Sequence, residues 1–440
     1  MTHSLLLDEL AAFAADAKAG ASASRKQLAL HVADAAIALM AGMRGTDGRL
    51  AATLMHRFDT SPLAHTARLA TVMRLSEIDD IHRPSAVTAS AIAVPCALAM
   101  RAHADNASAA RFADAIFVGQ ELALRLALAM GGAGLLARGL WPTYLVAPFG
   151  AAATTARLLG LNAARTAQAL ALALAQTPRA PGRTPHTPCP GRWPLFGQAV
   201  RAGCFAALAA ADGIDGDPAL LNDAWLANIA GGDADPTPLR ELDAASPLLA
   251  QVSIKPHCSA KQTLGAVYGL REVLARGIDA ASIDTIEIEV PGAYAGMIAR
   301  ETPAASRLAS IVSAPGQLAL AALQPASLDD VSRDALDWSG PLGAFAAKVS
   351  VRADPALDAL YPRQWPARVT VIAAARREQI LVTDSPGDPA LPFDTEAVID
   401  KATRVVGARR GLALVQTAIS ACEDASALHT LGPLFDLPEG

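Results

Sequence analysis

The first 275 residues repeat apolar positions at spacings of three and four, which places apolar side chains on one face of successive helices. The pattern predicts helices over 28–43, 89–102, 111–130, 148–161, 165–176, 197–212 and 260–274. Strand signals are nearly absent from this part, and its many alanines have the highest helix propensity of any residue. We therefore expect a large all-helical domain over residues 1–275.

The pattern changes at Ile283, where apolar and polar residues alternate with a period of two through Val290. This alternation is typical of a strand with one buried face. Further strand patterns lie at 348–352, 368–373 and 378–383, the last two placed to form a hairpin, and helical patterns lie between the strands at 308–323 and 328–336. The predicted fold class is mainly α, with a smaller α+β lid domain over 276–392 and C-terminal helices over 393–440 that return to the helical domain.

Composition excludes several classes of function. The net charge of the 440 residues is −5 without a basic block, which argues against nucleic acid as a partner. The apolar stretch 122–136 is interrupted by Arg125 and by glycines, and the N-terminus carries acidic residues, so neither a membrane span nor a signal peptide is expected. The five cysteines lack C-x-x-C spacing, so no metal site is indicated. We expect a cytoplasmic protein with free thiols.

Three carboxylates, a histidine and an arginine fall within seven residues, from Glu77 to Arg83, just before a predicted helix. Crowded carboxylates raise one another's pKa, and an imidazole beside them can carry a proton near neutral pH. Asp79, Asp80 and His82 are therefore candidates for a general base. The alternative is a solvated helix end in which Asp79 and Arg83 pair across one turn.

The segment 177–197 is rich in proline and holds Arg179, Arg183, His186 and Arg192. Its six prolines argue against a helix, and a loop of this length is usually functional or disordered. An arginine on a stiff loop can bind a carboxylate through two parallel hydrogen bonds. A flexible surface loop with ordinary arginines is the alternative.

Two of the six lysines, Lys255 and Lys261, lie at the start of a predicted helix with His257 and Cys258 between them. Free backbone N–H groups and the helix dipole attract anions at such an end, so the segment predicts a carboxylate site. Cys258 is a candidate for a thiol of lowered pKa. The alternative is an ordinary N-cap formed by Ser259, with both lysines in solvent.

These segments, in this order along most of the chain, resemble the MmgE/PrpD family, which includes 2-methylcitrate dehydratase, cis-aconitate decarboxylase and iminodisuccinate epimerase. The resemblance rests on the helix from Asp34 to Gly42, the E-x-D-D-x-H segment at 77–82, Phe149-Gly150-Ala151-Ala152-Ala153, the segment Gly197 to Gly203, Ser253-x-Lys255-Pro256, and Gly387-Asp388-Pro389. It implies a helical domain with an α+β lid, and a lyase or isomerase of small polycarboxylates that needs no cofactor and is often a homodimer.

The resemblance also implies which residues surround the substrate. Glu77 stands at the family's leading acid, and Asp79, Asp80 and Lys255 match family positions directly. Ile81 replaces the threonine that follows the paired aspartates in the family.

The remaining family positions are substituted. Arg192 replaces a lysine, Trp141 stands at a histidine, and Thr88 lies nearest to the place of a second histidine. A tyrosine of the family's lid falls near Gly316, beside Gln317. The anion-binding framework is therefore retained, while two histidines and one tyrosine are lost, as in a divergent branch of the family.

The main hypothesis is a cofactor-independent lyase, either a dehydratase or a decarboxylase, that acts next to a carboxylate of a small di- or tricarboxylate. Asp79, Asp80 or His82 would remove the proton, and His257 or protonated His82 would donate one. The expected substrate-binding residues are Arg192, Lys255 and Lys261, which would stabilise an enolate-like state, together with Glu77, Thr88, Trp141, Cys258, Gln262 and Gln317.

Three alternatives remain open. The first is an isomerase or epimerase of a similar substrate. The second is a catalytically impaired protein that binds a carboxylate or partners another enzyme, which the lost histidines and tyrosine suggest. The third is a helical prenyl-transfer or terpene enzyme that uses Asp79 and Asp80, but His82 and Arg83 would repel the Mg²⁺ that such enzymes need. The expected partners are a small carboxylate substrate and a second copy of the chain.

Overall fold

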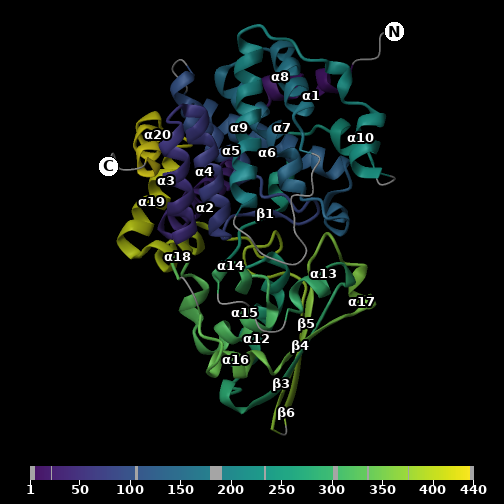
Figure 1. The fold of residues 1–440 in the computed structure, drawn as a ribbon, viewed down its shortest axis with the longest axis vertical. Coiled ribbons are helices and arrows are strands. Elements are labelled where there is room, and N and C mark those ends of the chain that lie inside the picture. The colour runs from purple at the N-terminus through teal and green to yellow at the C-terminus, as the bar shows by residue number, and fades with distance from the viewer. Residues whose placement is uncertain are drawn as a thin grey trace.

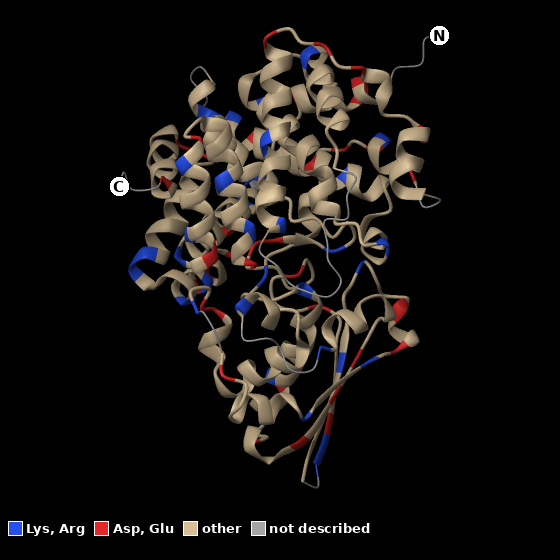
Figure 2. Cartoon of the chain, in the orientation of Figure 1, with Lys and Arg blue, Asp and Glu red and all other residues tan. Residues whose placement is uncertain are grey.

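The structure is a computed structural model that describes residues 5–20, 22–104, 108–178, 191–231, 234–300, 306–333, 336–374 and 376–436. It consists of a helical body and a smaller α+β part, the lid, which is built from β3–β6 and α12–α17 and lies below the body in Figure 1. The mainly α fold class predicted from the sequence is confirmed. Charged residues of both signs lie along the chain where the body meets the lid (Figure 2).

The body combines helices from both ends of the chain. Its helices are α1 (Leu6–Asp16), α2 (Ser22–Arg44), α3 (Thr46–Phe58), α4 (Pro62–Ser76), α5 (Ser90–Met100), α6 (Ala109–Ala129), α7 (Pro142–Leu159), α8 (Ala163–Ala175), α9 (Arg192–Ala211), α10 (Asp223–Ala230), α11 (Thr237–Arg240), α18 (Thr395–Val406), α19 (Ala408–Ser420) and α20 (Ala425–Leu431). Helices α18 and α19 pack against α2, and their apolar side chains join the same core as the N-terminal helices.

Helix α9 packs closely against α4 and α7. A Cβ atom on Gly197 would stand 2.2 Å from Oγ1 of Thr71, and one on Gly203 would stand 2.1 Å from the carbonyl oxygen of Pro148. A larger residue would overlap the neighbouring helix at either position, so the two glycines allow this contact. The contact fixes α9, whose first residue is Arg192, against the body.

Within the described ranges, α9 is the one unbroken helix that is long and apolar enough to cross a membrane, and the pair Ser24–Arg44 and Thr46–Phe58 passes the same test only if a bend of 88° is allowed. Helix α9 contacts α4, α7 and α8, and more than half of its apolar window is buried in the protein. This is the usual position of a core helix, so its hydropathy is explained by packing.

Three helices begin five or six residues earlier than the sequence pattern predicted, and two others begin two residues earlier. Helix α2 begins at Ser22, where the pattern predicted a start at residue 28. The prolines of 177–197 were expected to exclude a helix, but α9 begins at Arg192 with Pro194 in its first turn. The N–H groups of a first turn have no partner within the helix, so a proline there breaks no hydrogen bond. Helix α7 begins at Pro142, whereas the sequence pattern predicted a start at Pro148, which lies inside the helix.

The lid contains a four-stranded sheet of order β4-β3-β5-β6. Its strands are β3 (Ile283–Val290), β4 (Val349–Ala353), β5 (Ala367–Ala373) and β6 (Arg376–Val382). Strand β3 is parallel to β4 and antiparallel to β5, and β5 and β6 form an antiparallel hairpin. All four predicted strands and the predicted hairpin are confirmed, with ends shifted by at most two residues.

Helices of the lid cover the sheet and form a second apolar core with it. They are α12 (Lys261–Ala275), α13 (Gly292–Ile298), α14 (Arg307–Ser310), α15 (Ala314–Leu323), α16 (Pro341–Ala346) and α17 (Pro355–Asp358). Helix α12 packs on β5, β6 and α15, so the second core begins before residue 276.

One helix prediction in the lid is refined by the structure, and one is wrong. The pattern at 308–323 is split into α14 and α15, because Ser313 caps a new helix by accepting a hydrogen bond from the Gly316 N–H. The pattern at 328–336 is not a helix in its described part: a short 3₁₀-helix, η7 (Pro325–Leu328), is followed by turns.

Candidate active site

A minimal sheet brings the acidic segment and the lysine segment together. Strand β1 (Ile81–His82) pairs antiparallel with β2 (Val252–Ser253). The next residue, Ile254, donates its N–H to the carbonyl of Gly387 over 2.9 Å. Three segments that are far apart in the sequence therefore meet at the junction of body and lid.

A cavity of about 110 Å³ lies at this junction, below the roughly 300–1,000 Å³ of drug-sized ligand pockets. Its polar lining consists of Arg74, Glu77, Thr88, Thr143, Arg192, Lys255, Lys261 and Gln262. Its apolar lining consists of Ile81, Ala86, Leu136, Trp141, Ala260, Met297, Ile311, Val312 and Trp365. The size suits a small metabolite, and the polar lining suits an anionic one.

The carboxylate of Glu77 lies among three of the cations. Its Oε1 is 3.4 Å from Arg74 Nη2 and 3.5 Å from Arg192 Nη2, and its Oε2 is 4.0 Å from Lys255 Nζ. Burial alone would raise the pKa of Glu77, but Arg74, Lys255 and Arg192 together lower it below its ordinary value. Its backbone adopts a left-handed conformation with φ of 58°, which is uncommon for a residue other than glycine and is found often at functional sites.

Asp79 is fully buried and lies behind the cavity wall. It accepts a hydrogen bond of 2.5 Å from Arg74 Nη1, and its Oδ1 is 3.7 Å from Lys255 Nζ. Burial alone would lower the pKa of Arg74, but Asp79 and Glu77 raise it, so Arg74 is a permanent cation. The sequence analysis missed Arg74, whose one signal was its place three residues before Glu77 on a helix.

Lys255 is buried and connects the two segments directly. Its Nζ donates to the carbonyl oxygen of Glu77 over 2.7 Å and lies 3.4 Å from that of Ser259. The alternative interpretation of this segment, an N-cap by Ser259, is not found, because the N-cap residue of α12 is Ala260 and the Ser259 hydroxyl bonds instead to Thr263. Lys255 therefore does not extend into solvent, and its ammonium faces the cavity.

Trp141 gives the cations an aromatic surface. The guanidinium carbon of Arg192 is 5.0 Å from the centre of the Trp141 ring and 4.2 Å from that of Trp193, and the guanidinium of Arg74 lies over Trp141 at 5.8 Å. Cation–π contacts of this kind hold a guanidinium in place without neutralising its charge. The indole at this position therefore orients two anion-binding groups.

Thr88 provides an uncharged group for a ligand. Its Oγ1 is buried, lines the cavity and has no hydrogen-bond partner among the described residues. Its backbone N–H donates to Oγ1 of Thr143 over 3.2 Å. Since buried hydroxyls are nearly always hydrogen-bonded, the Thr88 hydroxyl is available to a bound molecule.

Lys261 lines the same cavity, but its charge is balanced. Its Nζ lies 2.5 Å from Asp388 Oδ1 and donates to Ser385 Oγ over 3.0 Å. Arg83 pairs with Asp384 at 2.9 Å and with Asp388 at 3.3 Å. The predicted pairing of Arg83 with Asp79 is therefore not formed, and the acidic segment is buried and is not a solvated helix end.

Asp80 points into the body and does not line the cavity. Its carboxylate accepts hydrogen bonds from the Ser90 N–H at 3.3 Å and the Ser90 hydroxyl at 2.5 Å, and it lies 3.1 Å from Nδ1 of His31. A carboxylate bonded on both oxygens by the body has no position from which to reach a substrate in the cavity. We therefore assign Asp80 a structural role and withdraw it as a candidate base.

Four more predicted residues lie outside the cavity. His82 Nδ1 bonds to the Ser85 hydroxyl at 2.8 Å, and Cys258 Sγ bonds to the carbonyl of Ser76 at 3.2 Å. The amide of Gln317 donates to the carbonyl of Ser310 at 3.2 Å. His257 lines a different cavity. The predicted loop residues Arg179, Arg183 and His186 fall outside the described residues.

Burial holds three histidines neutral. It lowers the pKa of His82 and of His257 to about 3 and that of His65 to about 4, from an ordinary 6.5. The folded state therefore disfavours their protonation, and the stability that their neutral forms contribute is complete above pH 6.5 and is lost as the pH falls toward these values. Each such histidine makes the free energy of unfolding fall by about 1.4 kcal/mol per pH unit in this range.

We expect His82→Asn to lower the slope of the free energy of unfolding against pH by about 1.4 kcal/mol per pH unit between pH 6.5 and 4, which is the contribution of one proton. Urea unfolding at several pH values measures this slope. Asparagine keeps an oxygen near the place of Nδ1 but cannot be protonated. His56→Asn is the control, because His56 is exposed, and it should leave the slope unchanged. An unchanged slope in the His82 variant would contradict the burial argument.

Among the described residues, no group of three or more His, Cys, Asp or Glu side chains is arranged to hold a metal ion. No curated protein matches the chain. Residues 7–235 match the MmgE/PrpD N-terminal domain, and residues 257–425 match the MmgE/PrpD C-terminal domain. These two matches span most of the chain in the order that the family requires, and they place the cavity at the meeting of the two domains. The chain therefore belongs to the MmgE/PrpD family.

Proposed function

We propose that this protein is a cofactor-independent lyase that acts on a small di- or tricarboxylate. It either removes a proton next to a carboxylate and expels a β-hydroxyl group as water, or releases carbon dioxide and protonates the carbanion that remains. The charge of the cavity lining carries the proposal. Arg74, Arg192, Lys255 and Lys261 face a single lining carboxylate among the described residues, Glu77. Asp79 and Asp388 balance two of these cations, which leaves a net positive charge for an anionic substrate.

In this proposal Arg74, Arg192 and Lys255 bind the substrate carboxylates. Glu77 removes the α-proton, and the electron pair spreads onto the adjacent carboxylate as an enolate-like state that the cations stabilise. In a dehydration, Lys255 donates a proton to the departing hydroxyl group, so that water leaves. Substrate carboxylates that draw the three cations away from Glu77 would restore its basicity, because those cations are what lowers its pKa.

Two further candidate functions have specific support. An isomerase or epimerase needs a proton donor and a proton acceptor in one cavity, and Lys255 and Glu77 could provide both. A non-catalytic carboxylate-binding protein is supported by the lowered pKa of Glu77, which makes it a weak base in the absence of a ligand. The homodimer and the cytoplasmic location stay predictions.

The deciding experiment incubates the protein in heavy water with a panel of small di- and tricarboxylates and follows the mixture by proton NMR. We expect loss of a substrate α-proton signal, or a new alkene product, that is unaffected by EDTA. Glu77→Gln is the matched variant, because it keeps the shape and removes the base, and it should abolish the exchange. Binding by calorimetry without any exchange or product would exclude the lyase and favour the binding protein.

A further inference from the structure

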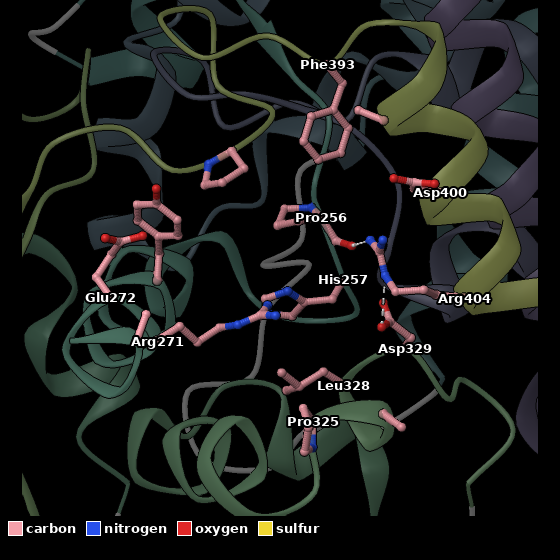
Figure 3. A pocket seen from close by; sticks show the side chains of 15 residues that line it. Pro256, His257, Arg271, Glu272, Pro325, Leu328, Asp329, Phe393, Asp400 and Arg404 are labelled. Carbon is pink, nitrogen blue, oxygen red and sulfur yellow. Dashed lines mark hydrogen bonds and ion pairs between the residues drawn. The ribbon is translucent and has the colours of Figure 1, made fainter. Parts of the chain in front are cut away.

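A second and larger cavity, of about 610 Å³, lies on the other side of the segment that carries Lys255 (Figure 3). It is bounded by α12, by η7, and by α18 with the loop that precedes it. Lys255 faces the first cavity, whereas Pro256 and His257 face the second. The proposed lyase chemistry does not use this space.

His257 is the polar group at the centre of this cavity in Figure 3. Its side chain is only 5 % exposed, and its Nε2 has no hydrogen-bond partner among the described residues. An unpaired buried polar atom is uncommon and destabilising, so a native cavity that contains one indicates a missing partner. Since the ring is neutral at neutral pH, it has one N–H to donate to an acceptor on a ligand.

The largest charge effects on His257 come from cations. Burial is the main cause of its lowered pKa, and the further contributions come from the cations Arg271, Arg404, Lys401 and Lys255. Arg404 is held by Asp329 at 3.2 Å and by the Pro256 carbonyl at 3.1 Å.

Arg271, in contrast, points toward the imidazole (Figure 3) and has no ion pair or hydrogen bond with any described residue. Asp400 lies across the cavity beside Arg404, and Glu272 lines the same end as Arg271, but its carboxylate lies farther from His257 than the Arg271 guanidinium does (Figure 3). An anionic group is therefore favoured in the space between Arg271 and His257. The lining also offers apolar surface: Pro256 and Leu328 lie beside His257, and Phe393 lies beyond Pro256 (Figure 3).

We propose that this second cavity binds a small organic anion, with a carboxylate or phosphate group at His257 and Arg271 and a flat apolar body against Phe393 and Pro256. Arg271 supplies the charge, His257 supplies a directional hydrogen bond, and the apolar lining separates this ligand class from the polar acids proposed for the first cavity. Because Lys255 and His257 are two residues apart, a ligand in the second cavity contacts the segment that positions Lys255.

Crystals soaked with para-bromobenzoate test the location through the anomalous signal of bromine. We expect a bromine peak near Phe393. A peak confined to the cavity of Lys255 and Arg192, or no peak at all, would overturn the proposal. Phenyl phosphate, in parallel soaks and in calorimetry, shows which of the two anionic groups binds more tightly.

Calorimetry with the same probes tests the contacts, in an Arg192→Ala background that weakens binding in the first cavity. Arg271→Ala should weaken binding about tenfold or more, because a charge-assisted hydrogen bond is lost. Arg276→Ala is the matched control, since Arg276 is an exposed arginine at the end of the same helix that pairs with Glu378, and its effect should stay within about twofold. Equal affinity in the Arg271 and Arg276 variants would refute the proposed site, whatever the outcome of the lyase assay.

Discussion

Lys255→Met is expected to lower the turnover number by a factor of about 100–1,000, the usual loss when one preorganised group that stabilises a developing negative charge is removed. Methionine keeps the length of the side chain and removes the ammonium that lies 4.0 Å from Glu77 and 3.7 Å from Asp79. The measurement is the steady-state rate with whichever carboxylate shows exchange by NMR.

The variant should still fold, because Arg74 continues to pair with Asp79 and Glu77. Circular dichroism and the thermal midpoint check this. Lys18→Ala, at an exposed lysine on the body, is the control and should keep the full rate. A folded Lys255 variant with an undiminished rate would remove the proposed mechanism.

Lys401→Met is expected to lower the free energy of unfolding by about 3–5 kcal/mol, the usual result of removing one partner of a buried ion pair. Lys401 is completely buried, forms an ion pair with Asp34 and donates to the carbonyl oxygen of Ile78 over 2.8 Å. Without the lysine, the Asp34 carboxylate has no cation beside it. Burial already raises the pKa of Asp34 to about 6 despite the lysine. Equilibrium urea unfolding measures the loss.

The double variant Asp34→Leu with Lys401→Met should recover most of that stability, since replacing both partners by apolar residues leaves no buried charge. Both variants lose the hydrogen bond from Lys401 to the carbonyl oxygen of Ile78. Because Ile78 lies between Glu77 and Asp79, the double variant should regain stability but still have reduced activity. A Lys401 variant as stable as the native chain would show that the Asp34–Lys401 ion pair does not stabilise the fold.

The regular parts of the fold were predictable because they depend on local periodicity. The alternation from Ile283 to Val290 identified β3 at both of its ends, since a strand with one buried face requires that pattern. The residue at which each helix begins was harder to predict. Pro194 was read as excluding a helix but lies in the first turn of α9, and Pro148 was read as the start of a helix but lies inside α7.

The candidate site was predicted as a set of segments more reliably than as a set of side chains. Glu77 and Lys255 line one cavity as expected, but Asp80 and His257, each within three residues of them, point elsewhere. Neighbouring residues in a segment without helical structure point to different sides, and the side that meets the ligand is set by distant packing. Arg74 was missed because its place three residues before Glu77 is a weak signal, and only the folded chain brings it against Asp79.

The two walls of the first cavity differ in chemistry. The body supplies the three charged groups Arg74, Glu77 and Arg192, whereas the lid adds the hydrocarbon and aromatic surfaces of Met297 and Trp365 beside Lys261, whose charge Asp388 balances. The proposed lyase would capture an acid from water through the charges of the body, and its proton transfer would take place in the space that the lid shields from water. Access of water to the cavity would therefore depend on how closely the lid covers it, while the cations of the body that attract the substrate stay in place.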